Sequence, residues 1–139
     1  MKINSIKLFI KQKQILIDKT LGKLIELNKK FNEVERDIIN AQKFYISLNE
    51  IGEQTVFCLK NKEKKQKEIK KIIQNYEHKK QKLNTEIKQL KEILKQYYSE
   101  KKALEKMLNK EEKNQQNKKV QQENNLANEN FIRKNFTLN

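Results

Sequence analysis

Apolar residues recur every seven positions over the first 48 residues of the chain, and this repeat limits the possible folds more than any other feature. The first row is Ile3, Ile10, Ile17, Leu24, Phe31, Ile38 and Tyr45. The second row, three positions later, is Ile6, Leu27, Val34, Ala41 and Leu48, interrupted by Lys13 and Thr20. A seven-residue repeat keeps one edge of a helix facing its partner only in a left-handed supercoil. The pattern therefore predicts one long helix over residues 2–48.

A second seam of the same kind follows a short break. Its rows are Ile69, Tyr76, Leu83, Leu90, Tyr97 and Leu104, and Ile73, Ile87, Leu94 and Leu108, with Lys80 and Lys101 as polar interruptions. In the break, residues 49–55, Gly52 can end one helix and Thr55 can cap the next. Each arm spans ~70 Å at 1.5 Å per residue, so the two arms match in length. We expect an all-α fold, with an antiparallel coiled-coil hairpin over residues 1–108.

The composition suits a two-helix seam better than a thick globular core. The chain has 139 residues, of which 35% are hydrophobic and 36% charged, with no proline and two glycines. The formal net charge is +14. Lysine supplies nearly all of the basic residues, because Arg36 and Arg133 are the only arginines. Lysine, asparagine and isoleucine have AT-rich codons, so part of this basicity reflects a base-biased genome.

Residues 60–82 are the most basic part, with ten lysines against Glu63, Glu68 and Glu77. One interpretation is a solvated helix face in a lysine-biased proteome. The other is a docking surface for an acidic protein. Outside the seam, Leu16, Ile25, Ile39 and Phe44 widen the apolar stripe of the first helix.

The last part of the chain, residues 109–139, is a polar extension that we expect to be helical with a frayed end, since a lone polar helix is marginal in water. Apolar residues return near its end: Leu126, Phe131, Ile132, Phe136 and Leu138. Such a cluster either docks back near the N-terminus or is captured by a partner.

Residues that could carry out catalysis are scarce. His78 is the only histidine, and a solvent-facing position is expected for it. Cys58 is the only cysteine, so we expect no disulfide and no metal site, and a small hydrophobic role near the turn. No glycine-rich phosphate loop is present. We expect a non-enzyme without cofactors or a small-molecule ligand.

The location follows from similar reasoning. No apolar run approaches the ~18 residues of a membrane span, and the N-terminus lacks a secretory signal. We therefore expect a cytoplasmic protein.

Three short stretches of the chain carry a resemblance to a known family. They are residues 20–24 through 41–45, with Tyr45 at the end, the run 69–83, and the aromatic-then-basic stretch 98–106. Asn128-Glu129 precedes a final basic pair, Arg133-Lys134. With these features the chain resembles the flagellar FliJ and injectisome YscO stalk family of type III secretion.

The resemblance implies a non-enzymatic stalk that joins a hexameric export ATPase to the membrane protein of the export gate, at the inner-membrane export apparatus. Export chaperones are further expected partners. The implied gate contacts are Ile38, Tyr45, Ile69, Ile73 and Tyr76, all of which also fit the interior of the hairpin. The implied contacts with the ATPase ring, near the chain ends, are Ile3, Ile6, Ile10, Lys101, Lys102 and Leu104.

Two other functions stay open. One is a structural coiled-coil subunit of a larger assembly, associating through the off-seam residues Leu16, Ile25 and Ile39. The other is a basic protein that coats nucleic acid without sequence preference. Specific nucleic-acid recognition is not expected, because base readout favours arginine and the aromatic residues mostly follow the seams.

Overall fold

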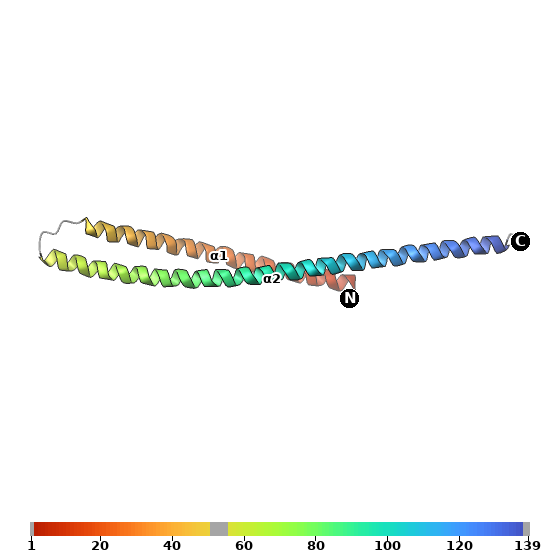
Figure 1. Ribbon diagram of the computed structural model, residues 1–139, viewed down its shortest axis with the longest axis horizontal. Coiled ribbons are helices and arrows are strands. Elements are labelled where there is room, and N and C mark those ends of the chain that lie inside the picture. Colours follow the sequence, from red (N-terminus) through yellow and green to blue (C-terminus); the bar gives the residue numbers. More distant parts are fainter. Residues whose placement is uncertain (1, 51–55, 138–139) are drawn as a thin grey trace. The chain divides into compact units, whose positions relative to one another are not determined.

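The described part of the chain forms two long helices that pack against each other (Figure 1). The computed structural model describes residues 2–50 and 56–137. Helix α1 is Ile3–Asn49 and helix α2 is Val56–Thr137. The predicted all-helical fold and the extent of the first helix are confirmed. Gly52 and Thr55, which define the predicted turn, lie outside the described residues.

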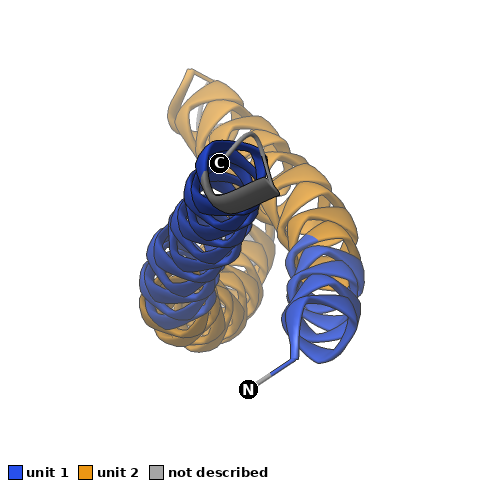
Figure 2. Ribbon diagram, turned by 90° about the vertical axis from the view of Figure 1, so that its right-hand side faces the viewer, with its two compact units in different colours: residues 1–17, 96–139 blue, residues 18–95 orange. Residues whose placement is uncertain are grey.

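The chain divides into two compact units, and both helices contribute to each (Figure 2). Unit 1 comprises residues 1–17 and 96–139, and unit 2 comprises residues 18–95. Each unit pairs a segment of α1 with a segment of α2, as the two predicted seams require.

Unit 2 contains the main apolar core. Val34, Ile38 and Leu83 form its buried centre, and Leu27, Phe31 and Tyr76 pack against them. The covered positions keep the seven-residue spacing of both seams, including Lys80, whose side chain is half-buried. Burial of each such aliphatic side chain contributes about 1.5–3 kcal/mol, so the seam is the chief source of stability in this unit.

Three pairs of residues align the helices of unit 2. The Asn49 side chain accepts a hydrogen bond from Gln66. The ammonium of Lys70 lies 5.7 Å from the centre of the Tyr45 ring. Further along, Lys80 pairs with Glu35 at 3.5 Å. The partner's number on α2 rises as the number on α1 falls.

Unit 1 packs the first turns of α1 against the middle of α2. Ile6 and Ile17 are each 1% exposed, which makes them the most deeply buried side chains described. On α2 the covered positions end at Glu111, and the residues from 112 to 135 are all exposed. The helix itself continues to Thr137. The predicted polar extension is therefore helical over its described residues.

Candidate partner-binding surfaces

The described residues hold no group of three or more histidine, cysteine, aspartate or glutamate side chains that could bind a metal ion. His78 is exposed, as predicted. It lines an open hollow of ≈ 620 Å³ with Gln81, Lys82, Thr85 and Glu86, all of which belong to α2. Cys58 is also exposed, so the prediction that it packs as a small hydrophobic residue was wrong. Within the described parts of the chain, neither helix combines the length and apolarity needed to cross a bilayer.

The five residues predicted to contact an export gate lie in the seam of unit 2. Ile38 and Ile69 are each 6% exposed. Tyr45, Ile73 and Tyr76 are half-buried, and Tyr76 packs against the Val34–Ile38–Leu83 core. These side chains therefore hold the two helices together. Contact with a gate protein stays a prediction for them, and it requires either their remaining exposed edges or an opening of the seam.

The six residues predicted to contact an ATPase ring lie together in unit 1. Ile6 is buried, Lys102 is exposed, and Ile3, Ile10, Lys101 and Leu104 are half-buried. Most of this set therefore packs within the unit. Lys102 is the member whose side chain is open to a partner.

Other apolar residues at the same end of α1 are exposed. Leu8 and Ile15 are 55% and 53% exposed, and Phe9 and Leu16 are 38% and 37% exposed. We call these four residues the N-terminal stripe. Leu8 and Ile15 stand seven positions apart, as do Phe9 and Leu16, so the stripe follows the helix. Phe9 and Leu16 directly precede the seam residues Ile10 and Ile17, whereas Leu8 and Ile15 lie on the side away from the seam. Residues 1–17 also contain four lysines and no acidic residue.

Of these four residues, only Leu16 was predicted from the sequence to extend the apolar surface. Leu8, Phe9 and Ile15 were missed because the a/d repeat explains the region without them. The available signal was their own seven-residue spacing. It adds apolar rows beside and behind the seam, and a helix with so wide an apolar surface is normally covered.

A second exposed apolar surface lies in unit 2. Phe44 is 54% exposed and Ile72 is 45% exposed. Phe44 directly precedes Tyr45 in the seam, and Ile72 directly precedes Ile73. Residues that directly precede these two rows of the seam lie on the same side of the helix pair. A groove further along the unit supports this placement. That groove, of ≈ 310 Å³, is lined by Lys23, which precedes Leu24, and by Ile93, which precedes Leu94.

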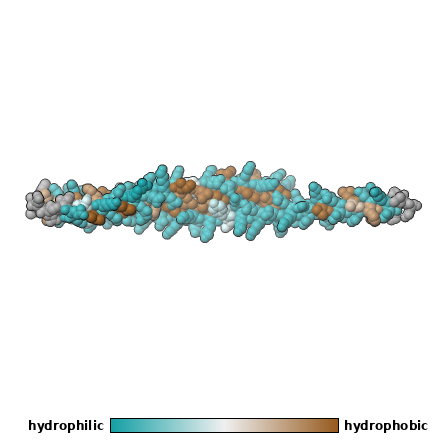
Figure 3. All heavy atoms as spheres, turned by 90° about the horizontal axis from the view of Figure 1, so that it is seen from above, coloured by the Kyte–Doolittle hydropathy of each residue, from teal (hydrophilic) through white to brown (hydrophobic). Residues whose placement is uncertain are grey.

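Lysines surround this apolar pair. Lys43 precedes Phe44, Lys71 precedes Ile72, and Lys65 stands seven positions before Ile72. All three are exposed. We call Phe44, Ile72, Lys43, Lys65 and Lys71 the lysine-rich surface. Figure 3 shows how brown apolar atoms reach the surface between teal polar side chains elsewhere along the molecule as well.

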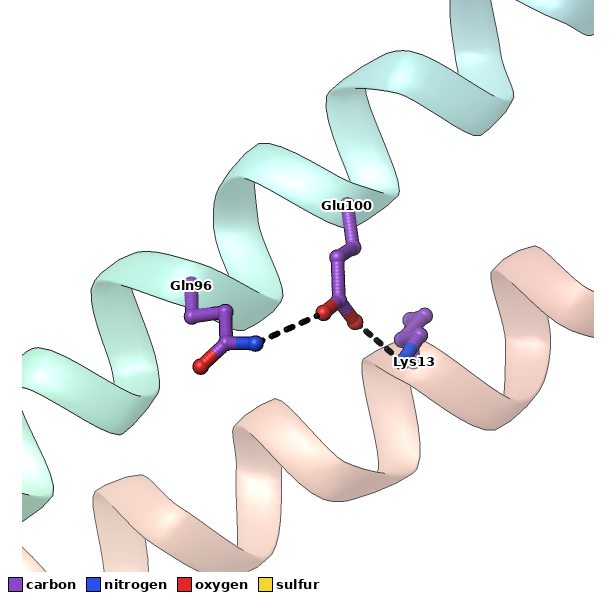
Figure 4. Close-up of polar contacts among 3 residues, drawn as sticks. All are labelled: Lys13, Gln96 and Glu100. Atoms are coloured by element: carbon purple, nitrogen blue, oxygen red, sulfur yellow. Dashed lines mark hydrogen bonds and ion pairs between the residues drawn. The ribbon is translucent and has the colours of Figure 1, made fainter.

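A polar cluster interrupts the seam in unit 1 (Figure 4). The ammonium of Lys13 pairs with the carboxylate of Glu100, and Gln96 donates a hydrogen bond of 3.2 Å to the other carboxylate oxygen. Lys13 also lies 5.4 Å from the centre of the Tyr97 ring. The hydrogen bond from Lys13 lowers the pKa of Glu100, although partial burial acts in the opposite direction. Beside this cluster, Lys101 donates a 2.6 Å hydrogen bond to Gln14.

In comparisons with known proteins, the chain matches no protein-family model, no curated protein and no solved structure.

Proposed function

We propose that this chain is an antiparallel coiled-coil stalk or escort protein of a type III, flagellar-type export apparatus. In this role it links a hexameric export ATPase to the export gate and promotes assembly of the ATPase, without catalysing a reaction itself. It works in the cytoplasm, at the periphery of the inner-membrane apparatus. Export chaperones are further partners of such a stalk.

The observation that carries the proposal is the pairing of α1 with α2, together with a polar extension of α2 whose described side chains, residues 112–135, are all exposed. The pairs Asn49–Gln66 and Glu35–Lys80 support an antiparallel register in unit 2. In unit 1, coverage of α2 ends at Glu111 while the helix runs on to Thr137. A helix pair with an exposed polar continuation supports the proposal, because the hairpin and polar extension predicted from the sequence have the same features.

The contact with the ATPase is assigned to the N-terminal stripe rather than to the seam residues of unit 1. Ile6 is 1% exposed, so it has little surface to offer a partner. Leu8 and Ile15 have more than half of their surface available. Burial of an exposed aliphatic side chain contributes about 1.5–3 kcal/mol, so these two residues alone can supply much of a moderate affinity.

The test is a pull-down of a purified export ATPase, followed by a measurement of its hexamer formation and ATP hydrolysis. The intact chain is expected to bind the ATPase and to stimulate its assembly. Leu8→Ser with Ile15→Ser is expected to weaken binding by about tenfold or more. Ile25→Ser with Ile39→Ser is the matched control, because those two residues are also apolar and exposed but lie in unit 2. Absence of binding by the intact chain would remove the proposal.

A structural coiled-coil subunit is the second candidate, and the same exposed residues favour it. Ile25 is 70% exposed and Ile39 is 48% exposed, both away from the seam. If they bury a further helix, the purified chain self-associates or needs a coiled-coil partner. A light-scattering mass above that of a monomer, reduced by the Ile25→Ser and Ile39→Ser pair, would favour this candidate over the stalk.

A further inference from the structure

We propose that the lysine-rich surface of unit 2 binds the surface of an anionic lipid bilayer. The inference concerns this chain alone and does not depend on the export proposal. It rests on two exposed apolar side chains, Phe44 and Ile72, and on the lysines beside them.

The apolar pair comes from two different helices at the same level of the unit. Lys70 lies over the Tyr45 ring, which sets Tyr45 level with residue 70 of α2. Phe44 directly precedes Tyr45, and Ile72 lies two positions after Lys70. Ile72 also directly precedes Ile73. Tyr45 and Ile73 hold equivalent places in their seams, since each is followed three positions later by the next seam residue. Phe44 and Ile72 therefore lie on one side of the helix pair. They therefore form a joint apolar surface instead of two separate exposed residues.

The charge around this pair has one dominant sign. Lys43, Lys65 and Lys71 are exposed. Lys65 holds the same place in the repeat as Ile72, whereas Lys43 and Lys71 stand one position before Phe44 and Ile72, at the outer edges of the two helices. Lys64 and Lys79 extend the positive charge along α2. Three acidic residues lie nearby: Asp37 stands seven positions before Phe44, Glu50 seven positions after Lys43, and Glu68 four positions before Ile72. A cationic helix surface with apolar residues at its centre is the composition of segments that lie in the interface of an anionic membrane.

The lysines of this surface suit diffuse attraction to lipid headgroups. The whole run 60–82 contains ten lysines and no arginine. Lysine acts as a strongly hydrated point charge, which suits diffuse attraction to a fluid layer of headgroups. Insertion of two apolar side chains is too weak to hold the chain on neutral lipid. The binding is therefore reversible and requires anionic lipid.

The test is cosedimentation of the full chain with vesicles of phosphatidylglycerol and phosphatidylcholine, compared with vesicles of phosphatidylcholine only. We expect binding to the anionic vesicles that weakens steeply with salt, and no binding to the neutral ones. Replacing Lys43, Lys65 and Lys71 with glutamine is expected to lower the partition coefficient by roughly a hundredfold. The pair Phe44→Ser and Ile72→Ser is expected to lower it by about tenfold.

Two matched controls separate the surface from the net charge. Lys88, Lys91 and Lys95 lie in the same unit on the opposite side of the seam, so replacing them with glutamine removes equal charge elsewhere. Ile46 is 56% exposed and also lies on the opposite side, so Ile46→Ser is the control for the apolar pair. These controls should retain most of the binding.

Several outcomes would overturn the proposal. Equal loss in the lysine variants and their control would mean that only net charge matters. Failure to bind anionic vesicles, together with binding of polyglutamate through the same lysines, would assign the surface to an acidic protein. Failure to bind vesicles combined with salt-sensitive binding of duplex DNA would assign it to nucleic acid. Circular dichroism of each variant shows that the helices are intact before binding is compared.

Discussion

The ammonium of Lys13 on α1 pairs with the carboxylate of Glu100 on α2, at a place where the seven-residue repeat of α1 calls for an apolar residue. Lys13 is half-buried instead of pointing fully into water, and its ammonium lies 5.4 Å from the centre of the Tyr97 ring. The interruption of the seam is therefore a polar contact between the helices. A single polar layer in a coiled coil commonly fixes the register of the two helices.

The lowered pKa of Glu100 predicts a pH dependence of stability in unit 1. A carboxyl group whose pKa is lower in the folded state stabilises that state above its ordinary pKa of 4.5. This contribution is lost as the pH falls through the lowered value. Glu100→Gln removes the contribution, so the difference in stability between the intact chain and the variant should be present at pH 7 and vanish in strong acid.

The measurement is a pair of denaturant titrations of both proteins at several pH values from 7 to about 2.5. The other carboxylates titrate in both proteins, so the difference isolates Glu100. Lys13→Gln should reproduce the effect of Glu100→Gln, and the double variant should add little. A difference that stays constant down to the lowest pH would show that the ion pair contributes nothing to folding.

Gly22 lies in the interior of α1, where it lowers helix stability. A Cβ added at this position meets no atom within 4 Å. Alanine is favoured over glycine in helix interiors by roughly 1 kcal/mol, so Gly22→Ala should raise the free energy of unfolding by about 0.5–1 kcal/mol. Thermal melting followed by circular dichroism checks this, with Asn28→Ala as an exposed control in the same helix. A lower melting temperature would mean that the glycine serves a close approach absent from this structure.

Neighbouring isoleucines of α1 test where the core lies. Ile38 is 6% exposed and packs with Val34 and Leu83, whereas Ile39 is 48% exposed. Ile38→Ala should therefore cost about 2–5 kcal/mol by loss of burial and creation of a cavity. Ile39→Ala should change stability by less than about 0.5 kcal/mol.

Urea titrations of the two variants give the comparison directly. If both variants lose equal stability, the burial pattern described for unit 2 is wrong, or Ile39 is covered in a self-associated form. Repeating the titrations at several protein concentrations separates these explanations, because only an oligomer shows concentration-dependent unfolding.

The seven-residue repeat predicted the buried positions of both helices because burial along a paired helix depends on spacing. Ile6, Ile17 and Leu83 follow directly from it. The repeat also placed Lys13, Lys80 and Lys101 in the seam but could not say where their charged ends go. Their partners, Glu100, Glu35 and Gln14, lie far away in sequence, and such pairs depend on the register between helices. The exposed residues Leu8, Phe9 and Ile72 were missed for a related reason. Whether a side chain outside the seam is exposed depends on how the two helices pack. The spacing within one helix shows only which of its residues fit the seam.

Lys80 occupies a position in an apolar row of α2, and its ammonium makes two contacts with residues of α1. Its ammonium lies 3.5 Å from Glu35 and 5.6 Å from the centre of the Phe31 ring. The Lys80 and Glu35 side chains are 34% and 43% exposed, so the ion pair contributes at most about 0.2–1 kcal/mol after screening by solvent. Leucine at this position would bury apolar area beside Phe31, a gain of about 1–2 kcal/mol. Lys80→Leu should therefore raise the free energy of unfolding by roughly 1 kcal/mol. Denaturant titration measures the gain, and Lys79→Leu is the matched control, since Lys79 is exposed outside the seam. A loss of stability in Lys80→Leu that salt reproduces in the intact chain would mean that the polar contacts outweigh the apolar burial.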